Sequence, residues 1–168
     1  MDNPFERTIA ALEKANVRYL IVGGVAVVLH GYLRTTADLD LIIDLSEPNV
    51  QRAIETLTGL GLRPRLPVRA EEFADAHRRR EWVETKGMTV FSMWDPARPG
   101  FSVDLFADPP LDFDEAFARS LEATLERTAA RVVSLGDLVE MKRLAGRPRD
   151  LEDVLQLESL ARLGAKEE

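Results

Sequence analysis

The 168-residue chain contains no cysteine and only two histidines. The lack of cysteine excludes disulfides and thiolate-bound zinc, and two widely separated histidines argue against a histidine-rich metal site. Any metal ion must therefore bind oxygen ligands, which favours magnesium or manganese. The chain also lacks an apolar run approaching the roughly 20 residues that cross a bilayer, and it has no internal repeat. These absences favour a globular protein without a membrane partner.

An excess of positive charge is also lacking. The formal net charge of −7 argues against indiscriminate nucleic-acid binding, because that affinity comes from lysine and arginine that neutralise phosphates. Three local basic clusters nevertheless occur, at residues 63–69, 77–80 and 142–149. A charge run is most often a solvated face, so composition alone assigns these clusters no role.

The length predicts a single domain covering residues 1–168, with a core at about 1–110 and a C-terminal helical part at about 111–163. The beginning, Met1-Asp2-Asn3-Pro4, lacks the basic and apolar regions of a signal peptide. The expected location is therefore the cytoplasm.

The segment from Tyr19 to Asp44 carries the most information. Tyr19 to Val22 is typical of a buried strand, Gly23-Gly24 of a tight turn, and the apolar residues that follow of a helix. Glycine permits positive φ and close approach of phosphate to the backbone, and the unpaired amides that begin a helix can bind that phosphate. We therefore predict that Gly23 and Gly24 bind nucleotide phosphates.

Two aspartates, Asp38 and Asp40, alternate along the next predicted strand and must share one face. At roughly 3.3 Å per residue they lie about 6.6 Å apart, and convergent carboxylates at that spacing can hold two divalent ions about 3.5–4 Å apart. A third aspartate, Asp104, interrupts the apolar strand pattern of residues 101–106. It can ligate the catalytic ion and act as general base. The three aspartates are the predicted catalytic and metal-binding residues.

The glycine pair, the sequence Arg34-x-Thr36-x-Asp38-x-Asp40 and the later strand aspartate together resemble the nucleotidyltransferase superfamily, whose best known member is DNA polymerase beta. Joined to the late segment 142–153, the pattern is similar to the small AbiEii-type branch, which includes toxins of toxin–antitoxin pairs. One departure is Gly24, because many superfamily members carry serine there, so phosphate contact would be by backbone. The resemblance implies an α+β fold with a mixed β-sheet core, flanking helices and a C-terminal helical segment.

The resemblance also implies an activity. It is the magnesium- or manganese-dependent transfer of a nucleoside monophosphate from an NTP, with two metal ions, to RNA (tRNA being one candidate) or to a protein hydroxyl. A cognate antitoxin is a further implied partner. Lys142 and Arg149 are implied to reach the nucleotide phosphates, with Asp150 and Asp153 holding these cations in position.

Several alternatives stay open at this level. Arg34 either contacts the triphosphate or forms a salt bridge that orders the aspartates, and Trp82, Trp94 and Phe101 either stack on a base or belong to the core. The whole chain has a second interpretation, a non-catalytic nucleotide-binding regulatory or interaction module. A third, a glycosyltransferase or phosphatase metal site, does not account for the glycine pair, and the chain is short for a sugar-nucleotide enzyme.

Elsewhere the periodicity of apolar residues and the turn residues predict further elements. They are helices at 5–15, 47–58, 71–83, 113–121 and 134–145, extended segments at 62–68, 88–93 and 130–133, and a final helix with Leu151, Val154 and Leu155 facing inward.

Overall fold

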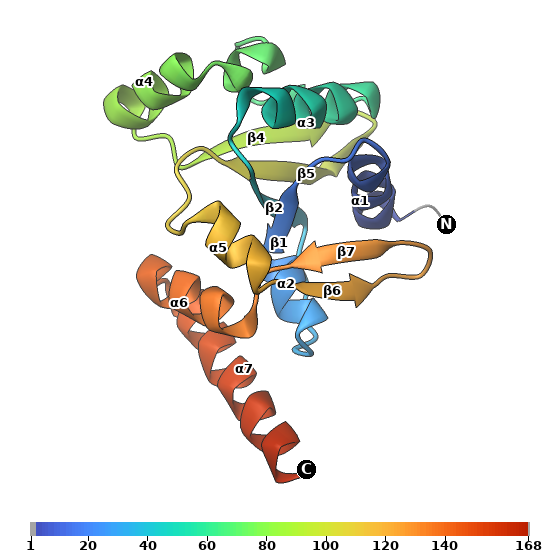
Figure 1. The fold of residues 1–168 in the computed structure, drawn as a ribbon, viewed down its shortest axis with the longest axis vertical. Helices are drawn as coiled ribbons and strands as arrows, with labels where there is room; N and C mark the ends of the chain where they lie inside the picture. The colour runs from blue at the N-terminus through green and yellow to red at the C-terminus, as the bar shows by residue number, and fades with distance from the viewer. Residues whose placement is uncertain (1–2, 168) are drawn as a thin grey trace.

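The computed structural model describes residues 3–167, so Met1, Asp2 and Glu168 lie outside the described residues, as do the parts of the predictions that fall on them. One seven-stranded mixed sheet has the strand order β3-β4-β5-β2-β1-β7-β6 and connects all parts of the fold (Figure 1). The strands are β1 Tyr19–Val22, β2 Asp38–Ile43, β3 Arg63–Pro64, β4 Val90–Asp95, β5 Arg98–Phe106, β6 Leu121–Thr124 and β7 Ala129–Val132.

Helices flank the sheet, and α7, the longest of them, extends away from the sheet toward the C-terminus (Figure 1). The helices are α1 Pro4–Lys14, α2 Gly23–Leu29, α3 Glu47–Gly59, the 3₁₀ helix η1 Ala70–Ala74, α4 Ala76–Lys86, α5 Phe113–Ala118, α6 Leu135–Ala145 and α7 Pro148–Lys166. Within residues 3–167, none of these helices combines the length and the apolar character that a bilayer crossing requires. The predicted α+β fold with a mixed sheet is confirmed.

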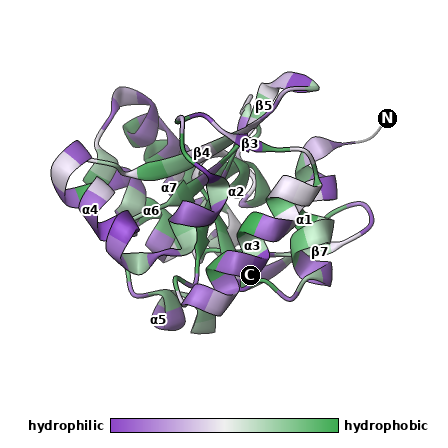
Figure 2. Cartoon of the chain, turned by 90° about the horizontal axis from the view of Figure 1, so that it is seen from above, coloured by the Kyte–Doolittle hydropathy of each residue, from purple (hydrophilic) through white to green (hydrophobic). Residues whose placement is uncertain are grey.

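The centre of the sheet is built from the most apolar strand. All four residues of β1 are buried, since the strand pairs antiparallel with β2 on one side and parallel with β7 on the other. Burying a leucine or isoleucine side chain contributes about 1.5–3 kcal/mol, so this strand anchors the fold. Figure 2 shows the same distribution, with hydrophobic strands inside and hydrophilic stretches on the outer helices.

Alternation along β2 and β5 separates a core face from a polar face. Leu39 and Leu41 on β2, with Val103 and Leu105 on β5, are fully buried. Asp38, Asp40 and Asp104 have the opposite parity on the same strands and are less buried. The period of two residues therefore places the acidic side chains on the face that is not filled by the core.

The predicted helix at 71–83 is wrong as one continuous element. The chain forms η1 and then restarts as α4 after Asp75. The Asp75 carboxylate accepts hydrogen bonds from the amides of His77 and Arg78 at 2.9 and 3.1 Å, so it caps α4 and separates the two helices.

The segment at about 111–163, predicted to be helical, also contains the hairpin of β6 and β7, which joins the sheet beside β1. The predicted helix at 113–121 ends at Ala118, and Leu121 already belongs to β6. The short strand β6 is largely exposed and has no clear apolar alternation, so its sequence gives little indication of a strand.

The inward face of the final helix differs from the prediction. Val154 is buried as expected, whereas Leu151 and Leu155 are 46% and 60% exposed. The buried positions of α7 are instead Asp150, Asp153, Val154 and Leu157. Two aspartates can occupy the inward face because cations from neighbouring elements pair with them, as described below.

Candidate active site

The turn between β1 and α2 brings the backbone against the acidic strand. Gly23 has φ +65°, and a Cβ atom added there would lie 2.0 Å from Oδ2 of Asp40. A Cβ atom added to Gly24 would lie 2.6 Å from Oγ1 of Thr36. Non-glycine Cβ atoms essentially never approach so closely, so glycine is required at both positions for the loop and the carboxylate to pack on the turn.

Strand register brings the three predicted aspartates onto one face. Asp40 on β2 is the register partner of Asp104 on β5, and Asp38 is the partner of Ser102. Ser102 donates a hydrogen bond to Asp38 at 2.6 Å, and Ser92 on β4 donates one to Asp104 at 2.5 Å. Each of these two carboxylates is therefore oriented by a serine on the neighbouring strand.

Burial and the repulsion of neighbouring carboxylates make Asp40 and Asp104 hard to ionise. Burial raises the pKa of Asp40 to about 7, and the charges of Asp104 and Asp38 add to the effect, while Lys142 and the backbone amide of Gly24 oppose it. Burial is also the main cause that raises the pKa of Asp104, with Asp38 adding to it. A cation bound between these carboxylates would offset their repulsion and favour their ionised forms.

The donor set fits a hard divalent cation. All three side chains offer carboxylate oxygens, which are the ligands that magnesium and manganese prefer. Within residues 3–167, no three acidic or histidine side chains stand close enough together to ligate one ion as they are oriented. One oxygen of Asp38 and one oxygen of Asp104 instead accept a hydrogen bond from a serine on a neighbouring strand.

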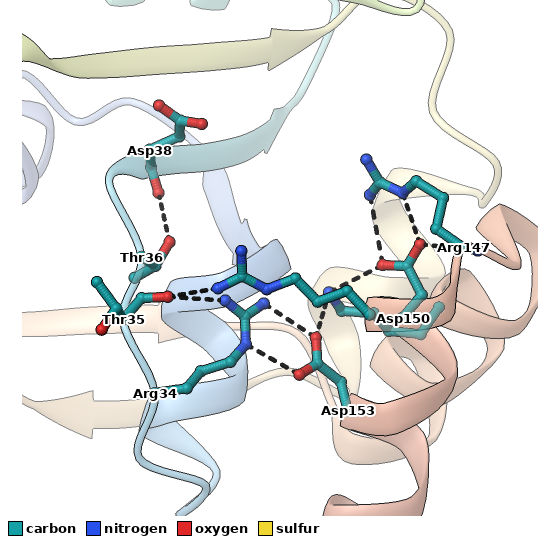
Figure 3. A network of polar contacts seen from close by, with 9 residues as sticks. Arg34, Thr35, Thr36, Asp38, Arg147, Asp150 and Asp153 are labelled. Carbon is teal, nitrogen blue, oxygen red and sulfur yellow. Dashed lines mark hydrogen bonds and ion pairs between the residues drawn. The ribbon is translucent and has the colours of Figure 1, made fainter.

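A buried ionic cluster lies beside the segment that leads into β2 (Figure 3). Nζ of Lys142 lies 2.9 Å from Oδ2 of Asp153 and 3.3 Å from Oδ1 of Asp150, and all three side chains are almost completely buried. Arg34 donates from Nη2 to Oδ2 of Asp153 at 2.9 Å. Its Nε also lies 2.9 Å from Oδ1 of Asp153, an ion pair without hydrogen-bond geometry. Arg34 therefore forms a salt bridge, but its partner is Asp153 of α7 and not an aspartate of β2.

Two further arginines form polar contacts at the beginning of α7 (Figure 3). Arg147 pairs with Asp150 at 2.7 Å, and Arg149 donates to the carbonyl oxygen of Thr35 at 2.6 Å. Asp150 and Asp153 therefore hold Lys142 as predicted, whereas Arg149 is held by a backbone carbonyl. Arg147, which the sequence did not single out, takes the place predicted for Arg149.

These groups line one cleft of about 900 Å³ between the polar face of the sheet and α6. All eight predicted site residues contribute to it: Gly23, Gly24, Arg34, Asp38, Asp40, Asp104, Lys142 and Arg149. The cleft also has an apolar wall that sequence reasoning missed, formed by Val90, Phe106, Leu138 and Met141. The available signal was parity, because Phe106 lies two residues after Asp104 on β5 and must share its face.

The aromatic residues considered for base stacking lie elsewhere. Trp82 and Phe101 are 4% and 5% exposed and belong to the core. Trp94 is half-buried on β4 and does not line the cleft. The core interpretation is therefore correct for Trp82 and Phe101.

Solved structures share this arrangement of elements. They include the lincosamide antibiotic adenylyltransferase LnuA bound to lincomycin (15% identity, TM-score 0.58, covering 88% of this chain and 90% of that one). ANT(2")-Ia in complex with adenylyl-2"-tobramycin has 17% identity and a TM-score of 0.61 over 96% of this chain and 88% of that one. A nucleotidyltransferase-like protein from Paracoccidioides brasiliensis has 17% identity and a TM-score of 0.57, covering 92% and 74%.

The chain therefore has the nucleotidyltransferase fold, as the sequence resemblance implied. The narrower AbiEii-type branch finds no support among these structures. No protein-family model and no curated protein matches the sequence.

Proposed function

We propose that the protein is a nucleotidyltransferase that moves a nucleoside monophosphate from an NTP to an acceptor hydroxyl. The observation that carries the proposal is the placement of Asp38, Asp40 and Asp104 on one face of the sheet, beside a glycine turn and inside a cleft of the nucleotidyltransferase fold. Asp38 and Asp40 would hold two magnesium or manganese ions, and Asp104 would share the catalytic one. When bound, such ions neutralise phosphate charge during the displacement.

The proposed reaction is a displacement at the α-phosphorus. The acceptor hydroxyl oxygen forms a bond to that phosphorus, the bond from the α-phosphorus to the bridging oxygen breaks, and pyrophosphate leaves. Asp104 takes the hydroxyl proton, since burial raises its pKa and makes it a stronger base than a surface carboxylate. Catalysis then depends on alignment of the acceptor with the nucleotide in the cleft.

In this proposal, the remaining cleft residues bind different parts of the nucleotide. Gly23, Gly24, Arg34 and Arg149 bind the β and γ phosphates, and the buried Lys142 adds positive charge from behind. An arginine can bind phosphate through two parallel hydrogen bonds, whereas a lysine acts as a point charge. The base packs on the apolar wall formed by Val90, Phe106, Leu138 and Met141.

The proposed acceptor is an RNA, with tRNA as one candidate, or a protein hydroxyl, and the proposed setting is a toxin with a cognate antitoxin. These finer assignments rest on the resemblance of the motifs at residues 34–40 and 142–153 to the AbiEii-type branch. LnuA and ANT(2")-Ia are described with lincomycin and adenylyl-2"-tobramycin, so antibiotics belong among the acceptors to be tested.

A non-catalytic nucleotide-binding module is the second candidate. It is favoured by one observation: one oxygen each of Asp38 and Asp104 is taken by a serine hydrogen bond, and within residues 3–167 no three acidic or histidine side chains are grouped to ligate one ion. Such a module would bind NTP without transferring any part of it.

The deciding experiment has two stages. Melting temperature is measured with each of the four NTPs, with and without magnesium or manganese. Transfer from α-³²P-labelled NTP is then measured to total cellular RNA, to cellular protein, and to lincomycin and tobramycin. Asp38→Asn and Asp104→Asn should abolish transfer while leaving the shape of the site nearly unchanged. The matched control is Asp108→Asn, an exposed position just after β5, which should leave transfer unchanged. A nucleotide-induced shift without transfer would favour the module, and no shift with any NTP would refute both.

A further inference from the structure

Two rows of side chains lead from the acidic site to the nearer edge of the sheet. Asp104 on β5 is the register partner of Ser92 on β4, and the amide of Arg65 donates to the Ser92 carbonyl at 3.0 Å. Trp94, two residues after Ser92, is the register partner of Arg63 on β3. Register partners on neighbouring strands project to the same face, so the two arginines and Trp94 lie on the face of Asp104.

The two arginines are available for a ligand. Both are exposed, and in the part of the chain that the structure describes no carboxylate lies within ion-pair distance of Arg63 or Arg65. The guanidinium carbon of Arg65 lies 5.9 Å from the centroid of the Trp94 ring. Two strand spacings place β3 about 10 Å from β5, so the pair lies next to the site of transfer.

Protection of the sheet edge explains only part of this arrangement. Charged residues on an edge strand discourage pairing with other chains, and β3, with two residues, is such a strand. Edge protection does not require a half-buried tryptophan beneath the Arg65 guanidinium, nor the position of both arginines on the face of the aspartates. Arg63 and Arg65 form no ion pair in the described residues, although the charge of Arg65 acts on Asp104, and with the aromatic ring they suit an anionic ligand that carries a flat ring.

We propose that Arg63, Arg65 and Trp94 form a platform that binds the last nucleotides of a single-stranded nucleic acid whose terminal hydroxyl reaches Asp104. A base stacks on the Trp94 ring, and the guanidinium groups bind the phosphates between the last residues. Transfer to the terminal hydroxyl of the bound strand rests on the proposed function, whereas binding of the strand does not. RNA and DNA both offer bases that stack and phosphates that bind arginine, and separate titrations with each distinguish them. A cationic acceptor is disfavoured by the same arginines.

The test measures binding without NTP. A 5′-fluorescein-labelled, 12-nucleotide single-stranded RNA, and DNA of the same sequence, are titrated with the full chain at three salt concentrations, with fluorescence anisotropy as readout. Trp94→Leu should weaken binding at least about fivefold, while Trp94→Phe retains most of the affinity because the ring can still stack. Arg65→Gln should weaken binding and lower the salt slope by about 1. Arg162→Gln, the same charge change on the distant end of α7 (Figure 1), should change neither.

Each contrary result overturns the proposal. If neither the RNA nor the DNA strand binds at protein concentrations up to about 100 μM, the weak end of non-specific affinity, the platform is refuted. If Arg162→Gln loses as much strand affinity as Arg65→Gln, the arginines act only through overall charge. The same conclusion follows if Arg65→Gln leaves the salt dependence of binding unchanged. If the wild type labels neither strand, and the wild type and Trp94→Leu label a protein acceptor at the same rate, the acceptor is protein and the platform is refuted. If Trp94→Leu does not fold, the Arg63→Gln/Arg65→Gln double variant decides by the same criteria.

Failure of the platform and failure of the proposed function give different results. Asp104→Asn removes a carboxylate near the bound end, so it should bind the labelled strand at least as tightly as the wild type while losing transfer. Strand binding by both proteins without transfer by either would keep the platform and refute the transferase. Transfer that is insensitive to Trp94→Leu and Arg65→Gln would keep the transferase and refute the platform.

Discussion

Replacing Asp40 with asparagine should stabilise the metal-free protein at neutral and alkaline pH. Burial beside Asp38 and Asp104 raises the pKa of Asp40 to about 7 from an ordinary value of 3.8. A group whose pKa is higher in the folded state contributes stability that is complete below the unfolded pKa and is lost as pH rises through the folded pKa. Asparagine keeps the shape and one accepting oxygen but never ionises. The variant therefore escapes the loss that the wild type undergoes above about pH 4.

The magnitude follows from the shift. About three pKa units at roughly 1.36 kcal/mol each give about 4 kcal/mol at pH 8.5, an upper bound because water entering the cleft screens the ionised carboxylate. About half of this difference already exists at pH 5.5, so the advantage of the variant should grow by about 2 kcal/mol between pH 5.5 and 8.5. For a chain of this size each kcal/mol shifts the melting temperature by about 2–4 °C.

The assay is thermal unfolding of wild type and Asp40→Asn in EDTA at pH 5.5, 7 and 8.5. Asp44→Asn is the control with the opposite sign, since hydrogen bonds from Ser46 and the Arg18 partner lower the pKa of Asp44 against the effect of its burial. That variant should be less stable than wild type above pH 4. Magnesium with NTP should raise the melting temperature of the wild type and not of Asp40→Asn. A wild type as stable as Asp40→Asn at pH 8.5 in EDTA would refute the electrostatic reasoning.

Three further outcomes are expected. Ser102→Ala frees the first aspartate of β2 from its hydrogen bond and should change magnesium affinity by about two- to tenfold, measured by calorimetry with NTP, while the melting temperature changes by only a few degrees. Lys142→Met leaves Asp150 and Asp153 buried with fewer cations and should destabilise the protein by about 3–5 kcal/mol in urea unfolding; an unchanged midpoint would show that the arginines suffice. Gly23→Ala should cost at least about 1–2 kcal/mol from its positive φ alone, and a normal melting temperature would contradict the close packing of the turn.

The first half of the site could be predicted because local rules act without competition there. The run from Tyr19 to Val22 is buried on both sides, Gly23 takes the positive φ that only glycine adopts easily, and Asp38 and Asp40 share a face by strand parity. The pairing of β2 with β5 could not be read from the sequence. It depends on a parallel contact between residues more than 60 positions apart, which no local pattern encodes.

The second half of the site escaped prediction because charge replaces hydrophobicity on an inward helix face. The periodicity of leucines predicted that Leu151 and Leu155 face inward, whereas Asp150 and Asp153 do so. Two buried carboxylates are unfavourable on any hydropathy scale, and they become acceptable only when the cations of other elements surround them. Knowledge of the tertiary partners is therefore needed before the helix can be oriented.

The ionic cluster explains how Lys142 can lie in the cleft without forming an ion pair with the sheet aspartates that would exclude a metal ion. An unpaired Lys142 would form an ion pair with Asp40, whose pKa it already opposes, and would occupy the place of a metal ion. Asp150 and Asp153 hold its ammonium group at 3.3 and 2.9 Å, and Asp153 holds Arg34 in the same way. The aspartates of α7 thus offset much of the charge of Lys142 and Arg34, and in the described residues neither cation forms an ion pair with the aspartates of the sheet.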